Sequence, residues 1–248
     1  MNERSLADWA PPGLPARTVL EGRYARLEPL SRTHIAGLRD AHREDQSGAI
    51  WTYLPVGPFD DAGYAVWVDA NRVLQDPLHF AVRMADGRLG GTLSLMRIAP
   101  LAGTIETGWL TFAPRLQRSR EATEAVYLLM KWAFEAGYRR FEWKCDAANR
   151  GSRQAAERFG FSFEGVFRQA SIVKGRNRDT AWFAAIDGEW PALCAAFETW
   201  LAPENFDVDG QQKCRLGDLT RPVLAASDPA LSENQADWSS RIRPSALS

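Results

Sequence analysis

The sequence predicts an α/β protein of the α+β type, in which helices flank a central sheet. Two observations carry this prediction. Strand-like and helix-like periodicities both occur along the chain, and their order is one strand, two helices and then three strands in succession. A doubly wound sheet would alternate strand and helix throughout, so we expect a sheet in which antiparallel neighbours dominate.

The composition is that of a globular protein. The chain has 248 residues, of which 45% are hydrophobic, and this is ample for a large core. A formal charge of −1 gives no overall attraction to nucleic acid or to an anionic membrane. We expect a cytoplasmic protein with neither as a partner, because no apolar run approaches the ~20 residues of a membrane span and the N-terminus lacks a signal-peptide segment. The 3 cysteines are scattered, which offers no metal-ligand spacing and no disulfide framework.

Three regions follow from the distribution of residue types. Residues 1–20 carry prolines without periodicity and are expected to form an N-terminal arm. Residues 21–200 contain all the periodic segments and form the expected domain. Residues 201–248 are rich in Asp, Ser, Pro and Gln, which predicts a tail that wraps the domain, joins a partner chain or stays disordered. A homodimer is compatible with the second of these alternatives.

The first elements are a strand and two helices. Residues 24–30 alternate between apolar and polar side chains, as a half-buried strand does. Ser31 is suited to cap the first helix and Asp60 to cap the second. Between the two helices lies the loop 50–59, in which aromatic residues gather.

Three strands and a long helix follow. Residues 79–84 and 91–98 predict a hairpin around an Asp-Gly turn, and residues 104–112 add a third strand. From Ser119 to about Gly137, apolar residues recur at intervals of three and four, which predicts a helix. The remaining elements are a strand at 140–145, a helix from Asn149, strands at 164–173 and 179–186 around the polar turn 174–177, and a helix at 190–200.

A basic turn, residues 115–122, lies between the third strand and the long helix. The first N–H groups of a helix have no partner within the helix and attract anions. Arg115, Arg118 and Arg120 stand in this turn and would add full positive charges. The sequence therefore predicts an anion site at the start of the helix.

This turn resembles the acyl-CoA pyrophosphate loop of the GNAT superfamily of N-acetyltransferases, whose pattern is Gln/Arg-x-x-Gly-x-Gly/Ala. Gln117 and Ala122 fit the two ends of the pattern. Arg120 stands in place of the middle glycine, where a side chain would hinder close approach of the pyrophosphate.

A second motif strengthens the resemblance. Asn149 and Ser152 precede Gly160 and Phe161 with the spacing of the family's Asn-x-x-Ser/Ala helix, which ends in Gly-Phe. Two motifs in the right order are harder to obtain by chance than one. The resemblance extends over roughly residues 22–190.

The resemblance implies a mixed, mostly antiparallel sheet of about seven strands, and acetyl-CoA as cosubstrate without a metal. In the family, backbone groups of the strand before the loop grip the pantetheine arm. The residues implied to bind the cofactor are Leu110, Thr111, Phe112, Gln117, Arg118, Ser119, Arg120, Glu121, Ala122, Asn149 and Ser152.

Two residues are candidates for catalysis. Some branches of the family use a strand glutamate as base, acting through water, and Glu106 occupies that place; alternatively it is a solvated strand residue. Ser152 matches a serine near the cofactor sulfur that could donate a proton, but serine is also common at a helix start. Ala156 stands where many relatives carry a tyrosine acid. The closer likeness is therefore to the branch that includes ribosomal-protein alanine N-acetyltransferases.

The expected activity is transfer of an acetyl group to a primary amine of a small molecule or protein N-terminus, by direct attack in a ternary complex. An aromatic wall with carboxylates suits a cationic amine. The segments that border the acceptor in the family imply Trp51, Tyr53, Glu106, Arg168 and Asp179 as acceptor residues.

Two other functions compete with this one. If Arg120 blocks the pyrophosphate, the domain is a non-catalytic GNAT-like module that binds acyl-CoA or a peptide. The arginines of the turn could instead form a nucleic-acid patch, but no basic stripe or base-stacking motif accompanies them.

Overall fold

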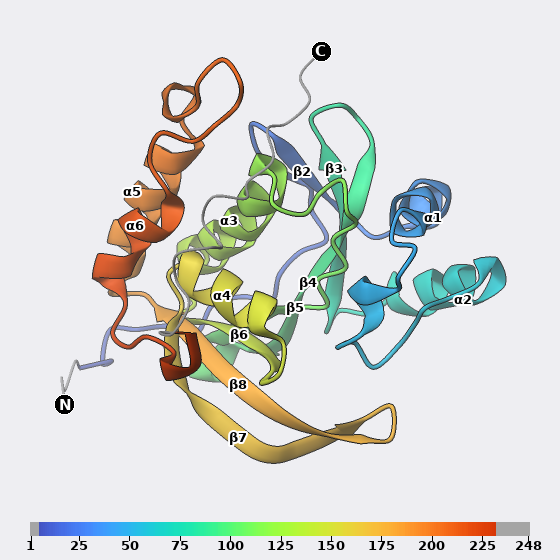
Figure 1. Ribbon diagram of the computed structural model, residues 1–248. Helices are drawn as coiled ribbons and strands as arrows, with labels where there is room; N and C mark the ends of the chain where they lie inside the picture. The colour runs from blue at the N-terminus through green and yellow to red at the C-terminus, as the bar shows by residue number, and fades with distance from the viewer. Residues whose placement is uncertain (1–4, 232–248) are drawn as a thin grey trace.

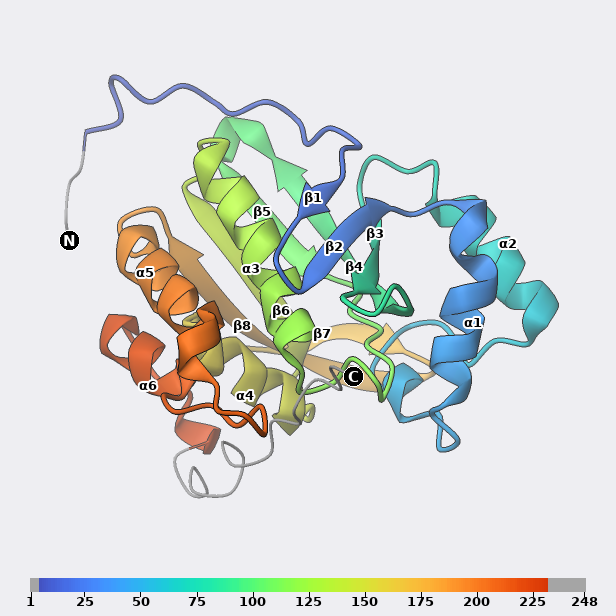
Figure 2. The same cartoon turned by 90° about the horizontal axis from the view of Figure 1, so that it is seen from above.

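The computed structural model describes residues 5–231, in which one sheet separates two groups of helices (Figures 1 and 2). The strands are β1 (Leu20–Glu21), β2 (Ala25–Pro29), β3 (Leu78–Met84), β4 (Leu89–Ala99), β5 (Thr104–Gly108), β6 (Arg140–Asp146), β7 (Ser162–Val173) and β8 (Arg176–Ile186). The helices are α1 (Ile35–Arg43), α2 (Asp61–Asn71), α3 (Arg120–Glu135), α4 (Arg150–Arg158), α5 (Trp190–Leu201) and α6 (Leu216–Thr220).

The sheet confirms the predicted fold class. Its 8 strands lie in the order β1-β2-β3-β4-β5-β6-β8-β7, and β5 with β6 is the parallel pair among antiparallel ones. The alternation along β3 supplies a core on each face. Phe80 and Val82 join the larger core with α3, whereas Ala81 joins a smaller core with α1 and α2.

Local sequence signals place the helix starts. The Asp60 side chain accepts from the Gly63 amide at 2.7 Å, and the Ser119 side chain accepts from the Ala122 amide at 3.0 Å. Ser31 differs from the prediction, since it precedes a short 3-10 turn, Arg32–His34, and α1 begins only after that turn.

The predicted third strand ends early, and this creates the feature on which the site depends. β5 pairs with β6 only as far as the contact of Thr107 with Trp143. Trp109 then adopts a φ of +53°, which breaks the ladder. The next segment returns to β4, because the Thr111 amide donates to the Thr92 carbonyl at 2.9 Å and the Ala113 amide donates to the Gly90 carbonyl at 2.8 Å. The chain therefore leaves β6 beyond Gly108, and the sheet splits there.

The hairpin of β7 and β8 turns more tightly than its polar run suggests. Val173 pairs with Arg176, so the loop is the dipeptide Lys174-Gly175 and not the predicted segment 174–177. Both residues have positive φ, 48° and 74°, as a type I′ turn requires. In Figure 1 the hairpin extends beneath the sheet toward the segment that precedes α2.

Both ends of the described chain lie against the domain. The Tyr138 hydroxyl donates to the Gly13 carbonyl at 3.1 Å, which ties the N-terminal arm to the end of α3. Within the expected tail, Phe206, Leu216 and Leu231 are buried. The part of the tail up to residue 231 therefore wraps the domain, and residues 232–248 lie outside the described residues, as do residues 1–4.

Candidate active site

A cavity of about 430 Å³ lies where β5 and β6 separate. Its walls come from the loop before α2, the segment after β5, the end of β6 and the start of α4. Seven of the predicted site residues line it: Tyr53, Glu106, Leu110, Phe112, Gln117, Asn149 and Ser152. Segments that are distant in sequence thus meet at one place, as a binding site requires.

Glu106 is a buried carboxyl group at the wall of this cavity. Only 3% of the residue is exposed, and burial raises its pKa to about 7, in spite of two nearby cations. The Lys144 ammonium lies 3.0 Å from Glu106 Oε2, and Arg97 Nε lies 3.2 Å from the same oxygen. The alternative of a solvated strand residue is therefore wrong for Glu106, and its pKa suits proton transfer near neutral pH.

Ser152 and Asn149 lie together at the start of α4. Asn149 caps the helix, since its side-chain oxygen accepts from the Ser152 amide at 3.1 Å. The Ser152 hydroxyl accepts from the indole of Trp143 at 3.0 Å and can still donate its own proton. Cys145 lines the cavity beside them, and burial raises the pKa of its thiol to about 11.

Residues 110–112, which follow Trp109, alternate in direction. Leu110 and Phe112 line the cavity, and within residues 5–231 the amide and carbonyl of Leu110 have no hydrogen-bond partner. Thr111 points the other way. Its hydroxyl lies 2.7 Å from that of Thr92, and its carbonyl is 2.9 Å from a ring nitrogen of His42. Thr111 is thus fixed within the protein, and its backbone does not face the cavity with that of Leu110.

The turn before α3 holds its arginines in different directions. The Arg115 guanidinium is bound by Asp40 of α1 and by Glu44, the residue that follows α1, at 2.8 and 2.7 Å. Arg120 is buried, and its guanidinium stacks on the rings of Tyr24 and Phe206 at 4.8 and 4.6 Å. These two side chains do not crowd the turn as expected. The side chain that replaces the motif's middle glycine therefore turns away from the loop.

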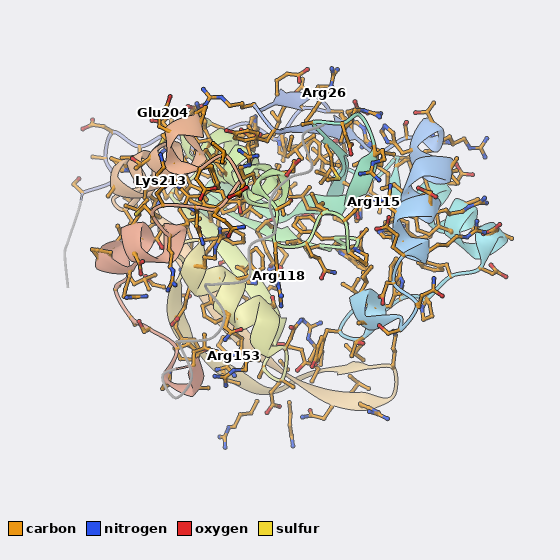
Figure 3. All side chains as sticks on the ribbon, turned by 45° about the horizontal axis from the view of Figure 1, so that its top comes forward. Arg26, Arg115, Arg118, Arg153, Glu204 and Lys213 are labelled. Carbon is orange, nitrogen blue, oxygen red and sulfur yellow. The ribbon has the colours of Figure 1, made fainter. Side chains whose placement is uncertain are left out.

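The remaining residues of this turn lead into and form the start of α3. Arg118 has a φ of +61°, and Figure 3 shows it between α3 and α4. Ser119, Glu121 and Ala122 are buried, so any contact between them and a cofactor depends on their backbone groups. Gln117 is the residue of the motif that lines the cavity, and its side-chain amide donates to the Phe112 carbonyl at 2.8 Å.

Three predicted acceptor residues lie away from the cavity. Trp51 is buried in the smaller core, because it packs against the rings of His42 and Phe59. Arg168 and Asp179 line a shallow depression on the outside of the hairpin. The Asp179 carboxylate accepts from the Gln169 amide at 2.7 Å and thereby supports an irregular part of β7.

The sequence analysis missed charged residues that do line the cavity. Lys144, Asp146 and Arg178 belong to neighbouring strands, β6 and β8. The period-two alternation from Trp182 through Thr180 to Arg178 was an available signal. This alternation alone does not show that Arg178 lines a cavity. Which face of β8 borders the cavity depends on the pairing of β8 with β6.

Two classes of feature are not found in residues 5–231. No group of three or more His, Cys, Asp or Glu side chains could hold a metal ion. None of the helices in this range combines the length and the apolar character needed to cross a membrane.

Comparison with known proteins identifies the family of the chain. The family model of the acetyltransferase (GNAT) domain matches residues 25–162. A crystal structure of a GCN5-related N-acetyltransferase from Brucella melitensis is 47% identical, with a TM-score of 0.84, and the match covers 86% of this chain and 99% of that one. A probable acetyltransferase of the GNAT family from Chromobacterium violaceum is 40% identical, with a TM-score of 0.72, over 77% of this chain and 98% of that one.

The fold also extends to the branch that the motifs resemble. An acetyltransferase from Salmonella typhimurium, which modifies the N-terminal serine of a 50S ribosomal subunit protein, matches with a TM-score of 0.59. It is 21% identical, and the match covers 68% of this chain and 99% of that one. No curated protein sequence matches the chain significantly. The family model, the close structural relatives and the split sheet agree, and the chain belongs to the GNAT family of acetyltransferases.

Proposed function

We propose that the protein transfers an acetyl group from acetyl-CoA to a primary amine of a small molecule or protein N-terminus, by direct attack within a ternary complex. The observation that carries this proposal is Glu106, a buried carboxyl group with a pKa of about 7 at the wall of the cavity. An amine is protonated at neutral pH and must lose a proton before it can attack. A base inside the cavity meets that need.

The reaction needs two proton transfers, and a different residue carries out each one. Glu106 accepts the proton of the incoming ammonium group, directly or through water. Lys144 and Arg97 keep its carboxylate form accessible, because each lies within 3.2 Å of the carboxylate. On the other side of the cavity, the Ser152 hydroxyl donates a proton to the leaving sulfur, while the Trp143 indole fixes the position of that hydroxyl.

The residues present fit acetyl-CoA. When bound, it supplies an activated acyl group as a thioester. Leu110 lines the cavity, and its amide can donate to the thioester oxygen because no described residue accepts its hydrogen bond. The helix start after Gln117 can receive the pyrophosphate. The Arg120 side chain is stacked on Tyr24 and Phe206, so the reason for expecting a blocked loop is removed.

Direct attack is supported by the chemistry of Cys145. Cys145 is the cysteine that lines the cavity. Burial raises its pKa to about 11, so at neutral pH it is a thiol and a poor nucleophile. An acetylated cysteine on the reaction path is therefore disfavoured.

The test measures release of free CoA with a panel of amines, amino acids and short peptides, for the wild type and for Glu106→Gln. We expect at least one amine to be acetylated, and we expect Glu106→Gln to lower kcat by on the order of 10²- to 10⁴-fold. Calorimetry with acetyl-CoA accompanies the assay. Tight binding without turnover of any acceptor would favour the non-catalytic module, and unchanged activity of Glu106→Gln would assign the base elsewhere.

A further inference from the structure

Arg178 brings a positive charge to the acceptor side of the cavity. On β8 it shares a face with Thr180 and Trp182. Trp182 pairs with Lys144, and on β6 Lys144 points to the same side as its contact, Glu106. Arg178 therefore lies on the face that carries the proposed base and not on the face that carries α4.

The guanidinium of Arg178 has no ion-pair partner within the described residues. The acidic and basic side chains that line the cavity are Glu106, Lys144, Asp146 and Arg178. Lys144 is paired with Glu106, and the Asp146 carboxylate accepts from the Ala148 amide at 2.8 Å. Arg178 has no ion pair or hydrogen bond in residues 5–231, and its Nε atom is buried without a partner. Burying a charged donor without an acceptor costs free energy. An unpaired donor of this kind is expected in a binding site, where the ligand supplies the acceptor.

We propose that Arg178 binds a carboxylate group of the acceptor, so that the enzyme acetylates the amino group of a small amino acid or a closely related amino carboxylate. The proposal rests on the function proposed above. A guanidinium group offers parallel N–H donors that match a carboxylate. The cavity of about 430 Å³ must also hold the acetyl end of the cofactor, which leaves room for a small acceptor. Glu106 would then take the proton of the amino group, while Arg178 fixes the other end of the molecule.

The experiment compares amino acids with their amides, which keep the shape of the acceptor but lose its charge. We expect the wild type to prefer the acids in kcat/KM by on the order of 10- to 100-fold. Arg178→Gln should abolish this preference by raising KM for the acids, with KM for acetyl-CoA unchanged. Arg178→Lys should retain part of the preference for the acids, because lysine keeps the positive charge but lacks the two parallel N–H donors of the guanidinium group.

Arg176 provides the matched control. It lies on the same strand, is exposed and does not line the cavity, so Arg176→Gln should keep the preference of the wild type. Two results would overturn the proposal: a wild type that prefers the amides, or an Arg178→Gln variant that loses activity equally toward acids and amides.

A binding measurement keeps the inference separate from the proposed function. N-acetylated amino acids and their amides are titrated by calorimetry in the presence of CoA. Tighter binding of the acids, lost in Arg178→Gln, supports the carboxylate site even if no acceptor in the panel reacts. Equal binding of acids and amides to the wild type would refute the carboxylate site, whether or not acetyl transfer is observed.

Discussion

At the scale of single residues, burial turns an ordinary strand glutamate into a group that titrates near neutral pH. Desolvation disfavours the carboxylate form of Glu106, while Lys144 and Arg97 favour it, and desolvation is the larger effect. Glu142 lies on the same face of the sheet and raises the pKa of Glu106 a little further. The pKa of about 7 thus depends on charged groups from both neighbouring strands, β4 and β6.

The pH dependence of the wild type should report this group. A base works as the carboxylate, so kcat/KM should rise with pH up to about pH 7 and then level off. Glu106→Gln should lack this rise. The measurement is kcat/KM between pH 5 and pH 9 with a fixed acceptor, expressed per ammonium form of the amine, because that is the form that the proposed base deprotonates.

Glu142→Gln is the control for that profile. Glu142 is buried but does not line the cavity, so its variant should keep the maximal rate. Removing its negative charge should move the rise to lower pH, because the Glu106 carboxylate is then easier to form. A rise that persists in Glu106→Gln would show that another group is the base.

Asn149 combines two roles that substitution can separate. Its side-chain oxygen caps α4, and the residue also lines the cavity. Asn149→Ala should lose about 1 kcal/mol of stability together with affinity for acetyl-CoA. Asn149→Asp should keep the cap and the melting temperature but still raise KM for acetyl-CoA, because aspartate cannot donate a hydrogen bond. If the aspartate variant has normal kinetics, Asn149 is only a helix cap.

At the scale of elements, the hairpin of β7 and β8 holds the loop that borders the acceptor side. The Lys174 ammonium donates to the Trp51 carbonyl at 2.8 Å and to the Gly57 carbonyl at 3.0 Å. Tyr53 lies between these two anchors and lines the cavity. The turn of the hairpin therefore fixes a wall of the cavity that is distant in sequence.

Lys174→Met should loosen this wall without disturbing the core. We expect KM for the acceptor to rise several-fold and limited proteolysis of the loop 51–57 to become faster, with KM for acetyl-CoA unchanged. Lys213→Met is the matched control, since Lys213 also donates to a carbonyl, that of Glu204 at 2.7 Å, but far from the cavity. Identical behaviour of the two variants would show that the contact of Lys174 has no part in acceptor binding.

At the scale of the whole molecule, the segment after α6 supports the helix α4, whose start borders the cavity. Arg153 of α4 forms two contacts with the Asp228 carboxylate, at 2.5 and 2.6 Å, and Asp228 is 1% exposed. The Asp228 amide also donates to Glu157 of the same helix. Because α4 begins at the cap Asn149, this clasp holds the end of the helix that lines the cavity.

Asp228→Ala should therefore affect both stability and cofactor binding. It leaves a buried guanidinium without its carboxylate, which costs about 3–5 kcal/mol in the free energy of unfolding. We also expect a higher KM for acetyl-CoA, because α4 loses its support. Asp218→Ala removes an exposed ion pair with Arg221 and should change stability by less than about 1 kcal/mol. Equal denaturant midpoints for the two variants would contradict a structural role for the clasp.

The sequence by itself determined the elements and the family. The caps Asp60 and Ser119, the helix after the basic turn and the Asp-Gly hairpin are all set by hydrogen bonds and periodicities that span a few residues. The two motifs identified the family for the same reason, since each lies within one turn and one helix. Glu106 and Ser152 were also found, through their places relative to these motifs.

Only the tertiary structure decided which side chains face the cavity and what charge they carry. In the folded protein, the Arg120 side chain stacks on Tyr24 and the Thr111 hydroxyl contacts that of Thr92. The tertiary structure also brought Arg178 to the wall of the cavity and, by burial, set the pKa of Glu106. These outcomes depend on strand register, on the split after Gly108 and on exclusion of water by segments that are distant in sequence. No local pattern contains that information, because a residue's neighbours across a sheet are chosen by packing of the whole domain.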